Sequence, residues 1–287
     1  MVDSKEILVS VLKKIDTLPT LPTTFAKISE MIENPKTNAN DISEVISKDQ
    51  VLTARLLKLV NSSLYGFSGR ITTVSNAVVI LGFKALRNLV LSSSVFDLFQ
   101  VSGTNQVISL NEFWRHSIAC AVASKLIANE IDYGEPEELF VAGLLHDIGK
   151  LVEIQYFQAS MANVVNKVNS EKMLIIDAEK KVLGFTHCEV GGLLGKKWKL
   201  PPPLIEVVMF HNDFLSAKKY HKLVAAVHLA DVFVRAVGVG NPGDKYVPPV
   251  EEGAWKVLGM KLSQIEKIME QIRPGVDEVM SFFMKAM

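Results

Sequence analysis

Helical periodicity runs through this chain from end to end and constrains its fold more than any other feature. Leu52, Leu56 and Leu59 follow one another at positions i, i+4 and i+7, which is the spacing of an amphipathic α-helix. Similar patterns recur along the sequence, and no useful stretch alternates apolar and polar residues as a strand would. We therefore expect an all-α fold.

The expected helices are separated by proline, glycine and asparagine. They cover about residues 4–15, 24–33, 75–99, 111–130, 136–148, 151–168, 171–183, 187–199, 203–211, 218–238 and 261–286, with two more beginning near Asn40 or Asp41 and at Asp49. Asp41 with Glu44 has the spacing of a capping box, and so does Thr186 with Glu189. The glycine- and proline-rich stretch Gly238–Pro248 is expected to be a loop.

Val101–Ser109 is the best candidate for a linker. We therefore expect an N-terminal helical part over residues 1–105 and a second helical part over residues 106–287. The hydrophobic fraction of 48% is enough for a sizeable core and argues against disorder.

The charge balance and the lengths of the apolar runs limit which partners and which cellular compartment we expect. The 31 lysines and arginines balance 31 aspartates and glutamates, so a nucleic-acid partner is not expected. No leader pattern is visible, and the longest apolar runs fall well short of the roughly 18–20 residues of a membrane span. We expect a soluble, cytoplasmic protein in which Cys120 and Cys188 are free core thiols rather than metal ligands.

The stretch Ala142–Lys150 places His146 and Asp147 at the end of an apolar run that should be buried. Burying an ionised carboxylate costs several kcal/mol unless a metal or a charged partner compensates. Adjacent imidazole and carboxylate groups suit a divalent ion. The pair is therefore a candidate metal site.

Two further polar residues lie on apolar helix faces. His116 shares its face with Ala119, Cys120, Ala123 and Ile127, and Asp231 shares its face with Val224, Val227, His228 and Val234. We expect His116, His146, Asp147 and Asp231 to converge on one centre. Two imidazoles and two carboxylates favour Fe, Mn, Mg or Ni over zinc. The alternative is a centre without metal, held together by hydrogen bonds.

His187 and His211 fall near helix ends and are candidates for the same cavity. They are either ligands of a second ion or structural histidines, and both alternatives stay open. Asn212 follows His211, and an amide is a poor cation ligand, so a second ion would bind weakly. His221 and His228 lack partners at ligand spacing and are expected to be structural.

The order of these residues resembles the H…HD…D pattern of the HD superfamily of metal-dependent phosphohydrolases. Other stretches resemble the HDOD branch of that superfamily, and together they cover about residues 15–235. They are Asp49–Leu57, Asn61–Gly66, Ala77–Gly82, Trp114–Ser117, Ala142–Gly149, His187–Gly191 and Trp198–Pro201. The resemblance implies a multi-helical HD-like bundle with an extra N-terminal helical subdomain and a role as a bacterial signalling output domain.

Lys150 extends the likeness, since His146–Lys150 resembles the catalytic version of the motif in the HD-GYP cyclic-di-GMP phosphodiesterases. If the chain is a hydrolase, the resemblance implies catalytic roles for Asp147 and Lys150. The chain departs from that group, because His211-Asn212 replaces the expected paired histidines and no Gly-Tyr-Pro motif follows.

Three functions follow from these features. The chain is a regulatory module that binds a signalling protein or a small ligand, a metallophosphohydrolase acting on a nucleotide or cyclic dinucleotide, or a helical scaffold with a buried polar network. The sequence favours the first, because no loop for reading a substrate is identifiable.

Overall fold

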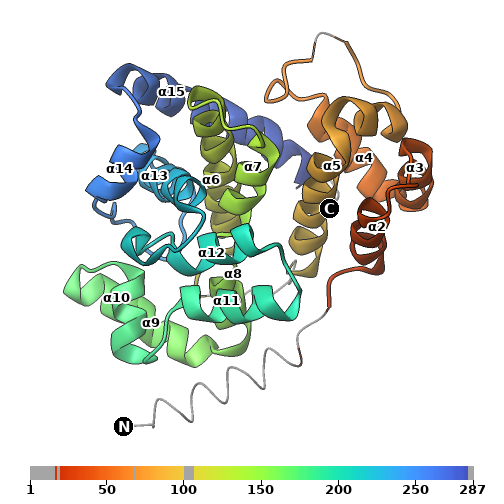
Figure 1. The fold of residues 1–287 in the computed structure, drawn as a ribbon. Coiled ribbons are helices and arrows are strands. Elements are labelled where there is room, and N and C mark those ends of the chain that lie inside the picture. The colour runs from red at the N-terminus through yellow and green to blue at the C-terminus, as the bar shows by residue number, and fades with distance from the viewer. Residues whose placement is uncertain (1–16, 18–19, 68, 100–106, 284–287) are drawn as a thin grey trace. The chain divides into compact units, whose positions relative to one another are not determined.

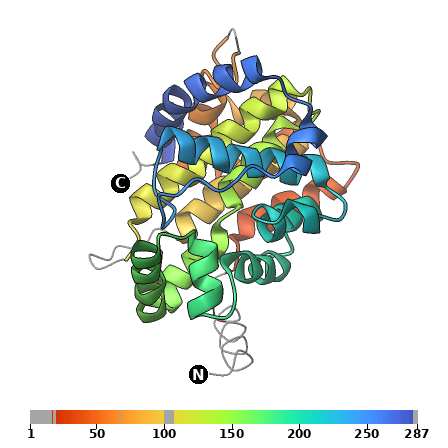
Figure 2. The same cartoon turned by 90° about the vertical axis from the view of Figure 1, so that its left-hand side faces the viewer.

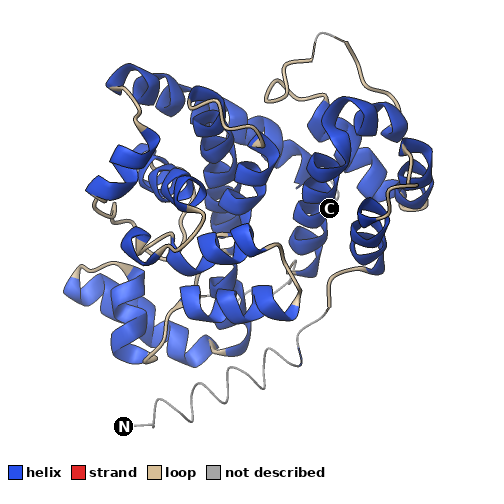
Figure 3. Cartoon of the chain, viewed as in Figure 1, coloured by secondary structure: helices blue, strands red, loops and turns tan. Residues whose placement is uncertain are grey.

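The computed structural model describes residues 17, 20–67, 69–99 and 107–283, and their regular structure is entirely helical (Figure 3). The prediction of an all-α fold is confirmed. The helix expected over residues 4–15 lies outside the described residues. The described helices are α2 (Thr23–Glu33), α3 (Ala39–Ser47), α4 (Gln50–Val60), α5 (Val74–Leu98), α6 (Leu110–Glu130), α7 (Pro136–Leu145), α8 (Ile148–Tyr156), α9 (Gln158–Glu171), α10 (Ile175–Val182), α11 (His187–Lys197), α12 (Pro202–Phe210), the 3₁₀ turn η1 (Phe214–Ser216), α13 (His221–Val237), α14 (Glu252–Leu258) and α15 (Leu262–Phe283).

The chain divides into two compact units. Among the described residues, one unit comprises residues 17 and 107–272, and the other comprises residues 20–67, 69–99 and 273–283. The end of α15 therefore belongs with the helices of residues 20–100, whereas the sequence grouped all of residues 106–287 together. Within this smaller unit the rings of Phe283 and Phe96 lie 4.9 Å apart, and the Ser63 amide donates to Glu278 at 2.8 Å.

Helices α3, α4 and α5 of the smaller unit begin at side-chain caps. Asp49 accepts from the Leu52 amide at 2.9 Å and starts α4, as its position predicts. The expected cap of α3 at Asn40 or Asp41 is wrong by two to three residues. Asn38 is the cap, because its extended backbone lets its side chain accept hydrogen bonds from the backbone amides of Asn40 and Asp41. The Asp41 side chain in turn accepts from the Asn38 backbone amide, which completes a capping box.

Helix α5 is long and apolar enough to cross a membrane by length and composition alone. Most of its apolar stretch is buried inside the protein, which fits the core helix of a soluble protein. Its backbone is also interrupted at Gly82, where φ is 82° and ψ is 166°. Only glycine adopts such a conformation without strain, so Gly82 kinks the helix.

The larger unit is built around α6, which packs against α7 (Figure 1), with α13 packed against both (Figure 2). The faces predicted for His116 on α6 and for Asp231 on α13 are buried. On the other side of the site, α11 packs against α8 and α12. These two groups of helices bring the candidate site residues together.

Three helix boundaries in this unit differ from expectation. The helix expected over residues 136–148 ends at Leu145, and α8 begins at Ile148, so that His146 and Asp147 form a two-residue junction. The helix expected over residues 151–168 breaks at Phe157. Helix α14 was not anticipated. The apolar period runs on through the breaks at residues 146–147 and at Phe157, so it does not mark where the chain changes direction.

Candidate metal centre

The junction between α7 and α8 fixes the first two candidate ligands. The His146 ring nitrogen Nδ1 lies 2.7 Å from the Gly143 carbonyl, so Nδ1 donates its hydrogen to that oxygen and Nε2 faces the centre. That Nε2 lies 3.4 Å from Asp147 Oδ2. The Asp147 carboxylate makes no capping bond to α8 and remains available to the centre.

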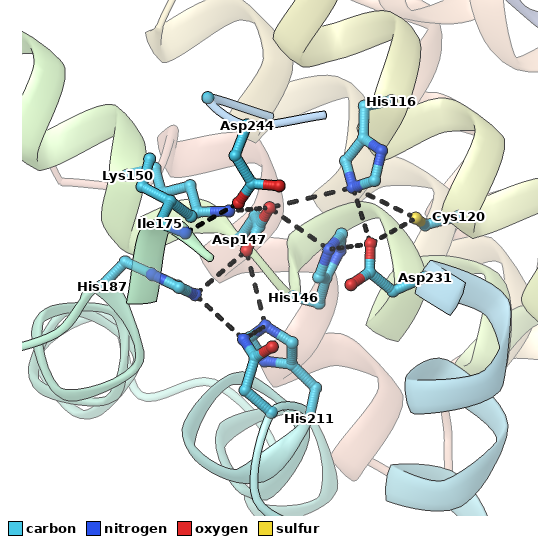
Figure 4. A network of polar contacts seen from close by, with 12 residues as sticks. His116, Cys120, His146, Asp147, Lys150, Ile175, His187, His211, Asp231 and Asp244 are labelled. Carbon is cyan, nitrogen blue, oxygen red and sulfur yellow. Dashed lines mark hydrogen bonds and ion pairs between the residues drawn. The ribbon is translucent and has the colours of Figure 1, made fainter. Parts of the chain in front are cut away.

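His116 and Asp231 approach the same point from α6 and α13 (Figure 4). His116 Nε2 lies 3.0 Å from Asp231 Oδ1 and 3.9 Å from Asp147 Oδ2. His146 Nε2 lies 4.0 Å from Asp231 Oδ1. The structure thus brings together the four side chains that the sequence placed on inward faces.

The second carboxylate oxygen of Asp147 faces two further histidines. Asp147 Oδ1 lies 3.2 Å from His187 Nε2 and 3.4 Å from His211 Nε2. His187 stands in the first turn of α11, which begins with the predicted capping box at Thr186. Asp147 therefore lies between two groups of imidazoles, one facing each of its oxygens.

Three neighbours make the second group a weaker cation site. The Asn212 amide nitrogen lies 2.7 Å from His211 Nε2 and 3.2 Å from His187 Nε2, so an ion that binds these two nitrogens would have to displace the amide. Burial alone would lower the pKa of His187, but Cys188 and Glu179 raise it well above its ordinary value. An ion at this position would therefore have to displace a proton.

Each carboxylate of the four-residue centre also has a buried cationic partner. Lys150 Nζ lies 2.7 Å from Asp147 Oδ2, and Arg235 Nε lies 2.9 and 3.0 Å from the two oxygens of Asp231. Burial alone would raise the pKa of Asp147, but His146 and Lys150 hold it well below its usual range. Burial alone would likewise raise the pKa of Asp231, but the positive charge of Arg235 is the main cause that holds it well below its usual range. Both carboxylates are therefore ionised.

Sequence reasoning missed Arg235 and Asp244. Arg235 Nη1 lies 2.7 Å from Asp244 Oδ1, and Asp244 Oδ2 accepts from the Ile175 amide at 2.8 Å. Arg235 lies four residues after Asp231 on a helix, and this spacing was an available signal for the ion pair between them. Nothing local marked Asp244, which lies in a loop and is buried through contacts far away in sequence.

The loop that carries Asp244 is held against α6. Gly240 adopts φ 71°, and a side chain on it would meet the His116 backbone nitrogen at 2.3 Å. The next residue, Asn241, donates its amide to the Glu112 carbonyl at 3.0 Å. The expectation of a loop here is correct, and its glycine allows a close approach to the helix that carries His116.

Behind His187 lies a pair of buried carboxyl groups that the sequence did not reveal. Glu179 Oε2 lies 2.7 Å from His187 Nδ1 and accepts from the His187 amide at 3.0 Å. Burial raises the pKa of Glu153 well above its ordinary value, and the charge of Glu179 adds to this effect. Glu179 thus orients His187. Glu153 holds a proton beside Glu179, because its pKa is raised.

The two cysteines are free and buried, as predicted. Their surroundings are not those of plain core thiols. Cys120 Sγ lies 3.5 Å from His116 Nε2 and 3.9 Å from Asp231 Oδ1 (Figure 4). Cys188 groups with His187 and His211 within 4.8 Å. Small apolar neighbours along each helix hid this placement in the sequence.

The remaining histidines are structural in their contacts. His228 Nδ1 lies 2.9 Å from the His211 carbonyl, and the Glu251 amide donates to His228 Nε2 at 3.1 Å. His221 is exposed at the start of α13, with its ring near Phe214. These contacts agree with the roles expected for both.

The four-residue centre fits a divalent ion. Among the described residues, the His146 Nε2 atom that faces this centre is buried without a hydrogen-bond partner. Bonds of about 2.0–2.2 Å from an ion to nitrogen or oxygen allow two donors to lie up to about 4.3 Å apart. The separations of His116 Nε2 and His146 Nε2 from the two carboxylates, 3.0–4.0 Å, fall within this limit.

Comparisons with known proteins give a matching family and several similar structures. The HDOD domain family model matches residues 18–214. The crystal structure of an HDOD domain protein of unknown function from Geobacter sulfurreducens shares 29% identity and a TM-score of 0.77, over 95% of this chain and 99% of that chain. The structure of a candidate phosphohydrolase from Shewanella amazonensis SB2B shares 27% identity and a TM-score of 0.70, over 95% and 96% of the two chains.

Curated relatives match over a smaller share of their own length. An uncharacterised protein of Treponema pallidum is 27% identical over 237 residues, which are 81% of this chain and 45% of that protein. Ribonuclease Y of Mycoplasma mycoides is 29% identical over 161 residues, 56% of this chain and 24% of that protein. This chain thus spans less than half the length of either relative.

An all-helical unit with a buried H…HD…D centre defines a domain of the HD superfamily type. Within that class, the family match over more than half of the sequence is decisive. The chain belongs to the HDOD family.

Proposed function

We propose that this protein is a signalling output module that acts by binding a partner protein or a small regulatory ligand. In this proposal it keeps an HD-type metal centre but has little or no hydrolase activity. The protein acts in the cytoplasm in this proposal. The balanced charge of the chain gives no reason to expect a nucleic-acid partner.

The burial of the centre is the observation that carries this proposal. His116, His146, Asp147, His187, His211 and Asp231 are each at most 2% exposed. A hydrolase of this class must bring a phosphoryl oxygen and a water molecule to its metal. Side chains buried to this extent leave little room for either.

The two cations near the centre support the same conclusion. Lys150 is fully buried, and its ammonium is held by Asp147. Arg235 is held by Asp231 and Asp244. Positioning and charge stabilisation of the phosphate supply a large share of catalysis. With both cations already paired, neither is available for that task.

The alternative is an active metal-dependent phosphohydrolase acting on a nucleotide, a cyclic dinucleotide or another phosphodiester. The full donor set favours it, as do the matches to the Shewanella protein and to ribonuclease Y. A bound divalent ion would lower the pKa of a water molecule and polarise the phosphate. His116, His146, Asp147 and Asp231 would hold it, and Lys150 would have to leave Asp147 to meet the substrate.

Metal content and turnover together separate the alternatives. Protein purified without chelator is analysed for metal, with Asp147→Ala as the test variant and exposed Asp213→Ala as the control. We expect metal in the wild type and the control, and loss of metal from Asp147→Ala. A wild type that binds no divalent ion would support the scaffold alternative.

The activity screen uses the metal-supplemented protein with cyclic dinucleotides, nucleotides, an RNA oligonucleotide and a generic phosphodiester. We expect turnover far below the enzyme median of about 10 per second. Turnover of that order, abolished by Asp147→Ala and kept by Asp213→Ala, would establish the hydrolase and refute the proposal.

A further inference from the structure

We infer that Cys120 is an additional ligand of the metal centre and that its sulfur makes the centre prefer soft and borderline ions such as Zn²⁺ over Mn²⁺ and Mg²⁺. The inference rests on the metal centre of the proposed function. It revises the preference expected from two imidazoles and two carboxylates alone.

The position of the sulfur fits a shared ion. Cys120 follows His116 by one helical turn on α6, so both side chains reach the same side of the helix. The ligand atoms of His116, Cys120, His146 and Asp231 all lie within 4.8 Å of one another. Figure 4 shows the sulfur beside His116 and Asp231, with a dashed line to each of them.

The distances from the sulfur to its two neighbours match those between donors that share one ion. A zinc ion bonds sulfur at about 2.3 Å and imidazole nitrogen at about 2.0–2.1 Å, which puts two such donors about 3.6 Å apart in a tetrahedral site. Cys120 Sγ lies 3.5 Å from His116 Nε2 and 3.9 Å from Asp231 Oδ1. Both distances place the sulfur within reach of an ion held by these two residues.

Packing alone does not account for this arrangement. The neighbouring inward positions on α6 are filled by Ala119 and Ala123, which are fully buried and carry no polar atom. A thiol is a weak hydrogen-bond donor and gains little at these distances. As a thiolate bound to an ion it is a strong ligand, and this use explains why the sulfur faces nitrogen and oxygen donors.

Coordination changes the protonation of the site. The S–H bond of Cys120 breaks, a metal–sulfur bond forms, and the proton passes to solvent. The ion then has nitrogen, oxygen and sulfur donors, a combination that favours Zn²⁺ or Fe²⁺ over the oxygen-preferring Mg²⁺ and Mn²⁺.

The test loads the metal-free 287-residue chain with one equivalent of Co²⁺, whose bond to a thiolate gives a near-ultraviolet charge-transfer band. Binding is measured separately by equilibrium dialysis. We expect the band in the wild type and in the matched control Cys188→Ser, and its loss in Cys120→Ser. The ratio of Zn²⁺ affinity to Mn²⁺ affinity should fall roughly ten- to a hundredfold in Cys120→Ser. This is at least the loss of metal affinity that is typical when a residue supporting a ligand is replaced.

The outcomes separate the two proposals. A wild type that binds no Co²⁺ refutes the metal centre and this inference with it. Bound Co²⁺ without the band, or a band that survives in Cys120→Ser, refutes the cysteine ligand and leaves the metal centre standing. If Cys120→Ser does not fold, X-ray absorption of the zinc-loaded Cys188→Ser variant decides, because sulfur must then remain in the first coordination shell.

Discussion

Arg235 holds Asp231 one helical turn away, with its Nε 2.9 and 3.0 Å from the two carboxylate oxygens. The same guanidinium reaches Asp244 through Nη1 at 2.7 Å. Lys150 holds Asp147 in a similar way. The centre therefore contains protein cations that offset its carboxylates before any ion binds, and its response to metal should differ from that of a site assembled by metal alone.

Replacing Arg235 with Met should strongly destabilise the protein and make its stability depend on metal. The change leaves Asp231 and Asp244 buried without their shared cation, and breaking a buried pair costs about 3–5 kcal/mol. A divalent ion should restore part of the loss, because it supplies positive charge beside Asp231. Urea unfolding with chelator and with Zn²⁺ measures both effects.

The control for this variant is Lys256→Met, which breaks an exposed pair with Glu252. That change should cost no more than about 1 kcal/mol and should not respond to metal. Equal metal dependence of wild type, control and Arg235→Met would show that Arg235 does not substitute for an ion.

Chelation should leave the wild type folded. Because Lys150 and Arg235 already pair with Asp147 and Asp231, removal of an ion does not expose uncompensated buried charge. We expect unchanged helical circular dichroism with EDTA and a lower midpoint of thermal unfolding, as mass action requires for loss of a bound ion. Loss of helicity on chelation would mean that metal drives folding, as in zinc fingers.

Gly149→Ala should disturb the packing of α8 against α11. A side chain at this position would lie 1.9 Å from the His187 carbonyl oxygen, a backbone atom that can move only with its helix. Overpacking of this kind costs about 1–3 kcal/mol or more. Gly134→Ala is the control, because nothing lies within 4 Å of the added carbon. Similar unfolding free energies for the two variants would contradict the close approach.

Glu153 should make the protein less stable as the pH rises. Burial and Glu179 raise its pKa in the folded state, so the folded protein keeps a proton that the unfolded chain loses above its ordinary pKa of 4.5. Between the two pKa values folding takes up a proton, and the free energy of unfolding falls with increasing pH. The contribution is fully present below pH 4.5 and is lost as the pH passes through the raised pKa.

Glu153→Gln removes this titration and should be more stable than the wild type at neutral pH. The difference should close as the pH falls towards 4.5. Urea unfolding across a pH series gives the measurement, with exposed Glu252→Gln as control. A difference that is constant with pH would show that Glu153 does not hold its proton in the folded state.

The helical period predicted the elements and the inward direction of His116 and Asp231, because one face of each helix must be buried. It could not locate the junction at His146 and Asp147, since an apolar run looks the same whether a helix continues or turns there. The capping box at Thr186 placed His187 correctly because this signal is local.

Long-range partners could not be predicted in this way. Asp244 reaches Arg235 and the Ile175 amide only through the fold of its loop. Glu153 and Glu179 meet across α8 and α10, and neither position is unusual for a helix in sequence. The placement of Cys120 depends on where α13 sets Asp231, which no pattern within α6 records.

The loop after α13 has a practical consequence for protein engineering. Although its glycines and prolines suggest a permissive surface segment, Gly240 rests on the backbone of His116, and Asn241 bonds to Glu112. An inserted tag or label there would push α6 away from the rest of the centre. The exposed turn around Gly134 has open space beside it and is the better point for attaching a probe.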